Sequence, residues 1–191
     1  VVEKIDFQFL ASVLNDIKKK GFEVVAVSLL HSYINPDHEL EVRNYFQDHF
    51  NSIPIVLSHE VAPEWREYER TSTTVVSAYI TPIVKDYLHR LSKELSDKKL
   101  KVPVHITQSN GGSMSSSQAS EQAVLTLFSG PVGGVVGGKE IGRLINQSNM
   151  ICIDMGGTSF DVSLIRNGEV ELNSEFELQG LPILAPSVEL V

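Results

Sequence analysis

The sequence feature that most constrains the fold is a pair of short apolar segments, residues 151–155 and 162–165, joined through two glycines. Glycine adopts positive φ without steric cost, so two apolar segments linked by Gly-Gly are typical of an antiparallel hairpin. Alternate side chains of a strand share a face, which groups Ile151, Ile153 and Met155. The segment therefore predicts two paired strands with a tight turn between them.

Two aspartates flank this turn. Asp154 ends the first apolar segment and Asp161 begins the second, while Thr158 and Ser159 add hydroxyl groups between them. Bare backbone amides and hydroxyls suit phosphate oxygens, and a carboxylate suits hydrated Mg²⁺ or a water molecule. From spacing alone, a phosphate site and an ordinary turn with two solvated aspartates both remain open.

The sequence Asp154-Met-Gly-Gly-Thr-Ser-Phe-Asp161-Val resembles the phosphate-binding hairpin of the actin, Hsp70 and sugar-kinase ATPase fold. It is more closely similar to a motif of the hydantoinase A/oxoprolinase family. Three further blocks resemble that family and precede the hairpin in the family's order: residues 67–74, 108–112 and 129–134. The resemblance implies a partial actin-like (ribonuclease H-like) α/β fold, in which a mostly parallel sheet with helices is followed by an antiparallel meander that opens a second lobe.

The same resemblance implies an enzyme that uses ATP and Mg²⁺ to phosphorylate a cyclic amide, such as hydantoin or 5-oxoproline, before the ring is opened. An unstrained amide is a poor electrophile, and phosphorylation of its oxygen supplies the driving force. An ATP-binding subunit of a ketone carboxylase is the alternative activity, and a non-catalytic, nucleotide-regulated module is a third. The expected partners are a small cyclic amide and a second subunit of the hydantoinase B type.

The resemblance also implies roles for single residues. Asp154 and Asp161 are the expected catalytic residues, with Asp154 holding Mg²⁺ through water. Phosphate is expected at the glycine turn and at the start of a second glycine-rich segment: Gly156, Gly157, Thr158, Ser159, Gly130, Gly133 and Gly134. Four positions in family-like blocks are further candidates without an assigned chemical role: Asn110, Gly111, Glu67 and Arg70.

Composition limits the classes of partner. The chain has 191 residues, of which 42% are hydrophobic, and a formal net charge of −8. Without a basic stripe, neither nucleic acid nor an anionic membrane is expected as a partner. No apolar run approaches the length of a membrane span, and neither a membrane segment nor a signal peptide is expected. The single cysteine, Cys152, is expected to be a buried structural thiol in a cytoplasmic protein.

The ends of the sequence suggest an internal piece of a longer protein, because residue 1 is valine and the last residues are apolar. The resemblance places another phosphate hairpin before this piece and a glycine-rich segment after it. Residues 1–65 are expected to end the family's N-terminal region, and residues 66–191 to begin its hydantoinase A domain, with a lobe switch near residues 113–148. Residues 1–191 alone are expected to bind ATP weakly or not at all, and to be inactive.

Alternating helices and strands are predicted for the first third of the chain. Apolar periodicity predicts a helix over residues 4–20 that stops at Gly21, and Asn35 is the expected cap of a second helix. Strands are predicted at residues 24–30 and 53–58. This order of elements is typical of a parallel sheet with helices packed on it.

The middle of the chain predicts a charged loop over residues 59–70 and then a long helix over residues 72–97. Pro82 lies inside this helix and should kink it or mark a break. Apolar side chains at helical spacing predict a buried stripe: Val76, Ile80, Ile83, Val84, Tyr87, Leu88, Leu91 and Leu95.

A strand at residues 102–107 is predicted to end in the turn at residues 108–112. Ligands gather at the carboxyl ends of strands in open α/β sheets, so this turn either faces a nucleotide or is an ordinary connection. The serine-rich residues 114–120 predict a short, flexible crossing on the surface.

A glycine-rich helix is predicted to begin at Ser129, as its cap, and Pro131. Glycines at intervals of four residues should give this helix a smooth face for the close approach of another backbone or a ligand: Gly130, Gly134, Gly138 and Gly142. The opposite side is predicted to pack through Val132, Val135, Val136 and Leu144. A P-loop is rejected because Glu140 follows Lys139 where Ser or Thr must bind Mg²⁺. After the hairpin, residues 169–176 predict a third antiparallel strand.

Overall fold

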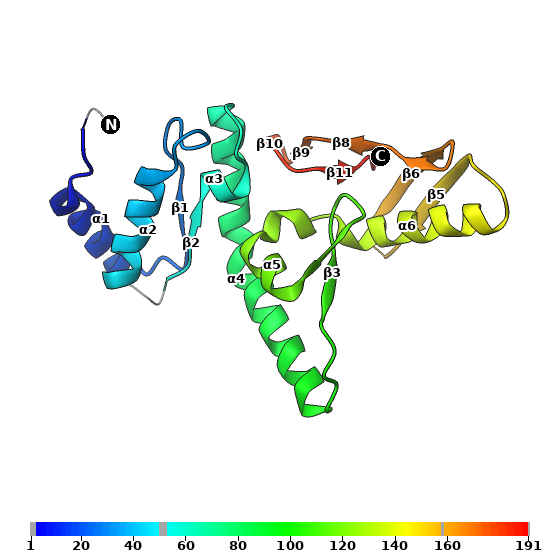
Figure 1. The fold of residues 1–191 in the computed structure, drawn as a ribbon, viewed down its shortest axis with the longest axis horizontal. Coiled ribbons are helices and arrows are strands. Elements are labelled where there is room, and N and C mark those ends of the chain that lie inside the picture. Colours follow the sequence, from blue (N-terminus) through cyan, green and yellow to red (C-terminus); the bar gives the residue numbers. More distant parts are fainter. Residues whose placement is uncertain (1–2, 50–52, 158, 191) are drawn as a thin grey trace. The chain divides into compact units, whose positions relative to one another are not determined.

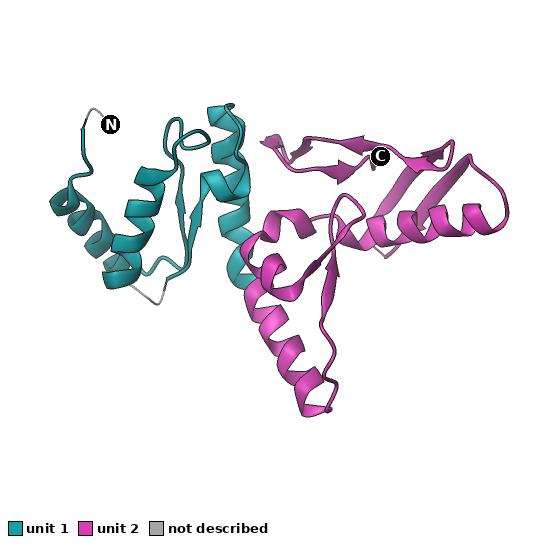
Figure 2. Cartoon of the chain, viewed as in Figure 1, with its two compact units in different colours: residues 1–83 teal, residues 84–191 magenta. Residues whose placement is uncertain are grey.

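The longest helix among the described residues, α4 (Glu67–Asp97), spans 31 residues, and the division of the chain into two units falls inside it. The computed structural model describes residues 3–49, 53–157 and 159–190. Unit 1 comprises residues 1–83 and unit 2 residues 84–191 (Figure 2). The unbroken helix shows that Pro82 does not interrupt α4, contrary to one of the two predicted outcomes.

Unit 1 begins with helix α1 (Phe7–Lys20). The side chain of Asp6 accepts hydrogen bonds from the backbone N–H groups of Gln8 and Phe9, and therefore caps the helix three residues after its predicted start. At the other end Gly21 adopts the left-handed conformation, with φ of 70°. The predicted stop is confirmed, because this conformation favours glycine.

Two parallel strands form the sheet of unit 1. Strand β1 (Val25–Val27) pairs with β2 (Ile55–Leu57), and helix α2 (Asp37–His49) connects them (Figure 1). Helix α3 (Ser58–Val61) follows β2 directly. Both strands are shorter than predicted because the next backbone groups leave the sheet, β1 for a loop held by α2 and β2 for α3.

The buried side of α4 differs from the predicted apolar stripe. Val76 and Leu88 are buried, but Ile83 and Tyr87 are exposed by 66% and 55%. Small hydroxyl side chains take the missing buried positions: Thr73, Thr74, Ser77 and Thr81. A threonine can be buried in a helix when its hydroxyl bonds to the carbonyl one turn back, as those of Thr74 and Thr81 do.

The serine-rich segment is ordered structure, not the flexible crossing that was predicted. Strand β3 (His105–Thr107) pairs with β4 (Ser113–Ser115), and helix α5 (Ser116–Glu121) follows. Ser115 and Gln118 form a reciprocal capping box that fixes the start of α5. Met114 and Ala119 pack with Leu88 in a buried cluster, which holds the segment in place. A short 3₁₀ turn, η1 (Ala123–Thr126), leads onward.

Helix α6 (Ser129–Leu144) and an antiparallel meander form the rest of unit 2 (Figure 1). The meander consists of β5 (Met150–Met155), β6 (Phe160–Arg166) and β7 (Glu169–Val170), and α6 packs against it. A core cluster joins the helix to β6 and to a segment near the end of the chain: Val132, Val135, Ile165 and Val188. Val136 and Leu144, which were predicted to pack, are exposed instead by 39% and 66%.

The third strand of the meander is shorter than predicted. At Glu171 the backbone carbonyl accepts from the N–H of Glu189, so pairing with β6 ends. Strand β8 (Leu172–Asn173) then pairs with β11 (Ser187–Val188). Strand β9 (Phe176–Leu178) pairs with β10 (Leu181–Ile183). No helix within the described ranges is long and apolar enough to cross a membrane.

Candidate functional site

The β5–β6 hairpin places its two aspartates directly opposite each other. Asp154 pairs with Asp161 across the strands, and the next pair, Met155 and Phe160, closes the ladder. Side chains of such pairs have Cβ atoms about 5 Å apart on one face of the sheet. The backbone N–H of Gly156 donates to the carbonyl of Ser159 over 3.0 Å, which tightens the turn. The two aspartates that flank the turn in the sequence are therefore cross-strand neighbours in the structure.

The turn offers an open surface of backbone. At Gly156 and at Gly157, an added Cβ would meet no atom of the described residues within 4 Å. Ser159 is exposed beside them, and Thr158 lies outside the described residues. Among the described residues no side chain crowds either glycine, so the turn can expose backbone to an anion.

The carboxylates alone do not make a complete metal cage. Among the described residues no three His, Cys, Asp or Glu side chains form a metal-binding group. A cation held by Asp154 would therefore complete its shell with water and phosphate oxygens, as Mg²⁺ commonly does. The donor set fits hydrated Mg²⁺ better than a tightly caged metal.

Helix α6 starts without a side-chain cap. Phe128 is its N-cap, and Ser129 is the first helical residue, so the predicted serine cap is wrong. The N–H of Val132 already donates to the carbonyl of Phe128, and Gly133 and Gly134 follow within the helical ladder. Only the first amides of α6 are therefore free for a ligand, and among the predicted glycines these include Gly130 alone.

The glycine face of α6 packs against the strands at only one end. A Cβ at Gly138 would lie 2.7 Å from the sulfur of Cys152, and one at Gly142 would lie 2.7 Å from the carbonyl oxygen of Gln147. Gly130 and Gly134 have no atom within 4 Å of the same position. Close approach is therefore present at Gly138, by the Cys152 side chain, and at Gly142, by the backbone of Gln147. At Gly130 and Gly134 no described protein atom approaches, and a ligand there stays a prediction.

Cys152 is partly buried between β5 and α6, as predicted for a structural thiol. Burial raises the pKa of the Cys152 thiol, which disfavours the reactive thiolate.

The turn after β3 has a packing role. Gly111 has φ of 85°, and a Cβ there would lie 3.0 Å from a methyl group of Val136 on α6. The side-chain oxygen of Asn110 accepts from the N–H of Gly112 over 2.8 Å. Of the two open interpretations, these contacts favour an ordinary connection that supports α6.

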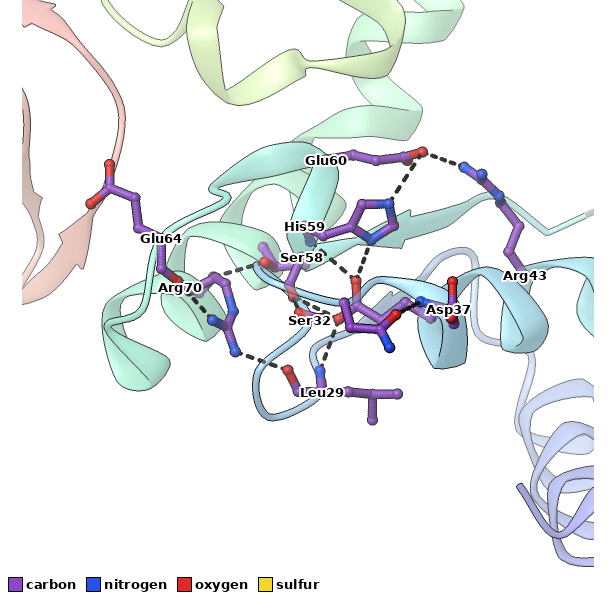
Figure 3. A network of polar contacts seen from close by, with 12 residues as sticks. Leu29, Ser32, Asp37, Arg43, Ser58, His59, Glu60, Glu64 and Arg70 are labelled. Carbon is purple, nitrogen blue, oxygen red and sulfur yellow. Dashed lines mark hydrogen bonds and ion pairs between the residues drawn. The ribbon is translucent and has the colours of Figure 1, made fainter. Parts of the chain in front are cut away.

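Arg70 is a buried residue with a structural role in unit 1. It is 1% exposed, and its guanidinium donates to the carbonyls of Glu64 and Leu29 over 2.7 Å and 2.9 Å (Figure 3). The same group lies 5.3 Å from the ring centre of Tyr33. Arg70 therefore ties two loops to the start of α4. Glu67 lies exposed in the first turn of that helix.

Glu39 is a buried carboxylate that sequence reasoning missed. It is 0% exposed and lies beside the carboxyl ends of β1 and β2. Its oxygens accept from the Ser58 hydroxyl at 2.6 Å, from the N–H of Leu29 at 2.8 Å and from the N–H of His59 at 3.1 Å. The Nδ1 atom of His59 lies 2.7 Å from the second oxygen. No local signal marks this residue, because an acid in the first turn of a helix is commonly exposed.

Burial raises the pKa of Glu39, but the hydrogen bonds from Ser58 and His59 outweigh it, so the pKa lies below its ordinary value. The group is therefore a charged structural anchor.

Comparison with known proteins finds relatives along nearly the whole chain. The family described as hydantoinase/oxoprolinase matches residues 70–191, and the hydantoinase/oxoprolinase N-terminal region matches residues 1–50. 5-Oxoprolinase 1 of Arabidopsis thaliana is 36% identical over 192 residues, which is 100% of this chain and 15% of that protein. The caprolactamase alpha subunit of Pseudomonas jessenii is 30% identical over 186 residues, which is 97% of this chain and 27% of that subunit.

A solved structure shows the same fold. The nucleotide-free structure of acetone carboxylase, an enzyme of ATP-dependent acetone carboxylation, matches with a TM-score of 0.85 and 31% identity. The match covers 95% of this chain and 26% of that one, so the chain spans about a quarter or less of the length of these relatives. Together with the parallel pair and the antiparallel meander, this likeness confirms the predicted partial actin-like α/β fold.

Proposed function

Because this chain belongs to the hydantoinase/oxoprolinase family, we propose that its full-length form uses ATP to hydrolyse a cyclic amide of the hydantoin or 5-oxoproline type. The observation that carries the proposal is the open glycine turn with two facing aspartates in β5 and β6. Relatives named for 5-oxoproline and caprolactam, two cyclic amides, support this substrate class.

The hairpin fits a nucleotide phosphate. Bound ATP supplies the phosphoryl group that activates the ring amide. Gly157, Thr158 and Ser159 are proposed to hold and orient the phosphate oxygens, and Gly156 shapes the turn because its N–H is bonded to the carbonyl of Ser159. Gly130, whose amide is free at the start of α6, is proposed as a second contact.

The two aspartates are proposed as the catalytic residues. Asp154 is exposed and would hold Mg²⁺ through water, where it offsets the negative charge of the phosphates. Asp161 is half-buried on the opposite strand, where it can accept a proton or a hydrogen bond from the reacting molecule.

An ATP-binding role in ketone carboxylation is the second candidate, since the likeness to acetone carboxylase covers 95% of this chain. The caprolactamase relative is one subunit of its enzyme, so we also propose a partner subunit of the hydantoinase B type. The proposed location is the cytoplasm. The proposed domain boundary near residue 65 and the lobe switch near residues 113–148 belong to the same hypothesis.

Substrate-stimulated ATP turnover tests the proposal. The full-length protein, with its partner subunit if it has one, should hydrolyse ATP faster when 5-oxoproline, hydantoin or caprolactam is added. Stimulation by acetone with bicarbonate, and by none of the cyclic amides, would select the carboxylase role. Turnover that no small substrate changes would support the nucleotide-regulated module instead.

A further inference from the structure

A cavity lies behind the glycine turn, between α6 and the inner face of β5 and β6. Its volume is about 420 Å³. Asp154, Asp161 and Ser163 line it from the strands, and Gly134 and Val135 line it from the helix. The cavity therefore joins the two proposed catalytic carboxylates to a wall that carries few polar groups.

The hydroxyl of Ser163 is the group in this cavity that needs a hydrogen-bond partner. The residue is 3% exposed, and within the described part of the chain its hydroxyl has no hydrogen-bond partner. A buried hydroxyl without a partner costs free energy, so such groups in native proteins are generally matched by a ligand or a water molecule. The hydroxyl thus marks a place where a polar atom of another molecule fits.

Ser163 and Asp161 form a donor and an acceptor side by side. They are two positions apart in β6, so both project from the same face with their Cα atoms about 6.6 Å apart. The hydroxyl can donate a hydrogen bond, while the ionised carboxylate can only accept one. The pair can therefore engage a ligand edge that carries one acceptor beside one donor.

A ring amide has such an edge. A small ring holds its amide in the cis form, so the N–H and the C=O point to the same side, whereas an open-chain amide favours trans. The carbon atoms of the ring need apolar contact, which Val135 and the glycines of α6 that line the cavity provide.

We propose that this cavity binds the cyclic amide substrate, with the Ser163 hydroxyl donating to the ring carbonyl and the Asp161 carboxylate accepting from the ring N–H. The inference rests on the proposed function. It adds a place for the substrate and a reason for selecting ring amides over open-chain amides.

The glycines of α6 allow a test in which cavity volume changes without a clash. A Cβ at Gly134 or at Gly137 would meet no protein atom within 4 Å, and both residues line the cavity. A Cβ at Gly133 is equally unhindered, but Gly133 does not line the cavity. Gly134→Ala therefore places a methyl group where the substrate would lie, and Gly133→Ala is the matched control.

The experiment measures the KM for hydantoin or 5-oxoproline and the affinity for Mg-ATP in the full-length protein. Ser163→Ala should raise the KM for the amide about fivefold to tenfold, the effect of one lost hydrogen bond. Gly134→Ala should raise the same KM with no loss of melting temperature, and Gly133→Ala should leave it unchanged. The affinity for Mg-ATP should be that of the unaltered protein in all three variants.

Two outcomes overturn the inference in different ways. If cyclic amides stimulate the unaltered protein and Ser163→Ala and Gly134→Ala keep its KM, the cavity is not the substrate site, while the proposed function stands. If no cyclic amide stimulates the unaltered protein, the proposed function fails and the inference fails with it.

Discussion

Glu39 in unit 1 and the aspartate pair in unit 2 show two opposite uses of carboxylates. Glu39 is 0% exposed, and hydrogen bonds from Leu29, Ser58 and His59 saturate it. Asp154 and Asp161 face each other beside an open turn, and within the described ranges no hydrogen bond to either side-chain carboxylate is found. Unit 1 therefore surrounds the charge of Glu39 with hydrogen-bond donors, whereas the described part of unit 2 leaves the charges of the two aspartates without such donors.

This difference separates structural anchors from ligand sites. A buried carboxylate is tolerated when donors surround it, and its value then lies in the loops that those donors fix. Two like charges on paired strands repel each other, so their placement is unfavourable until a cation or another partner arrives. The second arrangement is the one expected of a site that binds a cation and phosphate.

The largest expected effect is the loss of stability when the buried Glu39 is neutralised, compared with the same change at the exposed Asp154. Glu39→Gln should lower the free energy of unfolding by about 2–3 kcal/mol, because the new NH₂ group must face an N–H or O–H donor. Asp154→Asn is the matched control and should change stability by less than about 0.5 kcal/mol, since Asp154 is exposed. Urea unfolding of both variants measures the difference. Equal losses of stability would break the comparison.

Activity should show the reverse order. Asp154→Asn in the full-length protein should reduce Mg²⁺-dependent ATP turnover roughly 10- to 100-fold, which is the usual effect of removing a side chain that contacts a metal through its bound water. The fold should remain intact. Unchanged turnover, measured at saturating Mg-ATP, would remove Asp154 from the site.

Two glycines of α6 allow a similar comparison between a packed position, Gly142, and an open one, Gly134. Gly142→Ala should destabilise the protein by about 1–3 kcal/mol, because its methyl group would press on the backbone at Gln147. Gly134→Ala should stabilise it by up to about 1 kcal/mol, since alanine favours a helix and nothing is displaced. Thermal unfolding of the two variants provides the measurement, and coincident melting temperatures would contradict the packing described for α6.

The smallest expected effect is the pH dependence of the stability that Glu39 contributes. The pKa of Glu39 lies below its ordinary value of 4.5, so the group contributes stability above that value and loses it as the pH falls through the folded pKa. The difference in stability between the unaltered protein and Glu39→Gln should therefore shrink below about pH 4.5. Unfolding measured between about pH 6 and about pH 3 tests this. A constant difference across that range would show that Glu39 is not a charged anchor.

The hairpin could be predicted from sequence because its information is local. Two apolar runs, two glycines and two aspartates within fifteen residues specify the strands, the turn and the facing pair, and the register confirms them. Gly138 and Gly142 were also predictable, since glycines inside a helix need a reason such as close packing.

The buried polar groups could not be predicted from local patterns. Glu39 is buried because donors arrive from residues ten to twenty positions away, at Leu29, Ser58 and His59. Arg70 was singled out by resemblance, yet its role follows from carbonyls of two separate loops. Ser163 lies within a predicted strand, and only the packed helix reveals that its hydroxyl is buried and has no partner among the residues that the structure describes.

The most direct test of the proposed chemistry follows one oxygen atom. The full-length protein is given Mg-ATP and a cyclic amide whose carbonyl oxygen is labelled with oxygen-18, and the released inorganic phosphate is analysed by mass spectrometry. If the ring amide is phosphorylated on oxygen and then opened by water, the label appears in phosphate, and Asp154→Asn suppresses its transfer. Ring opening that leaves the phosphate unlabelled would contradict the account.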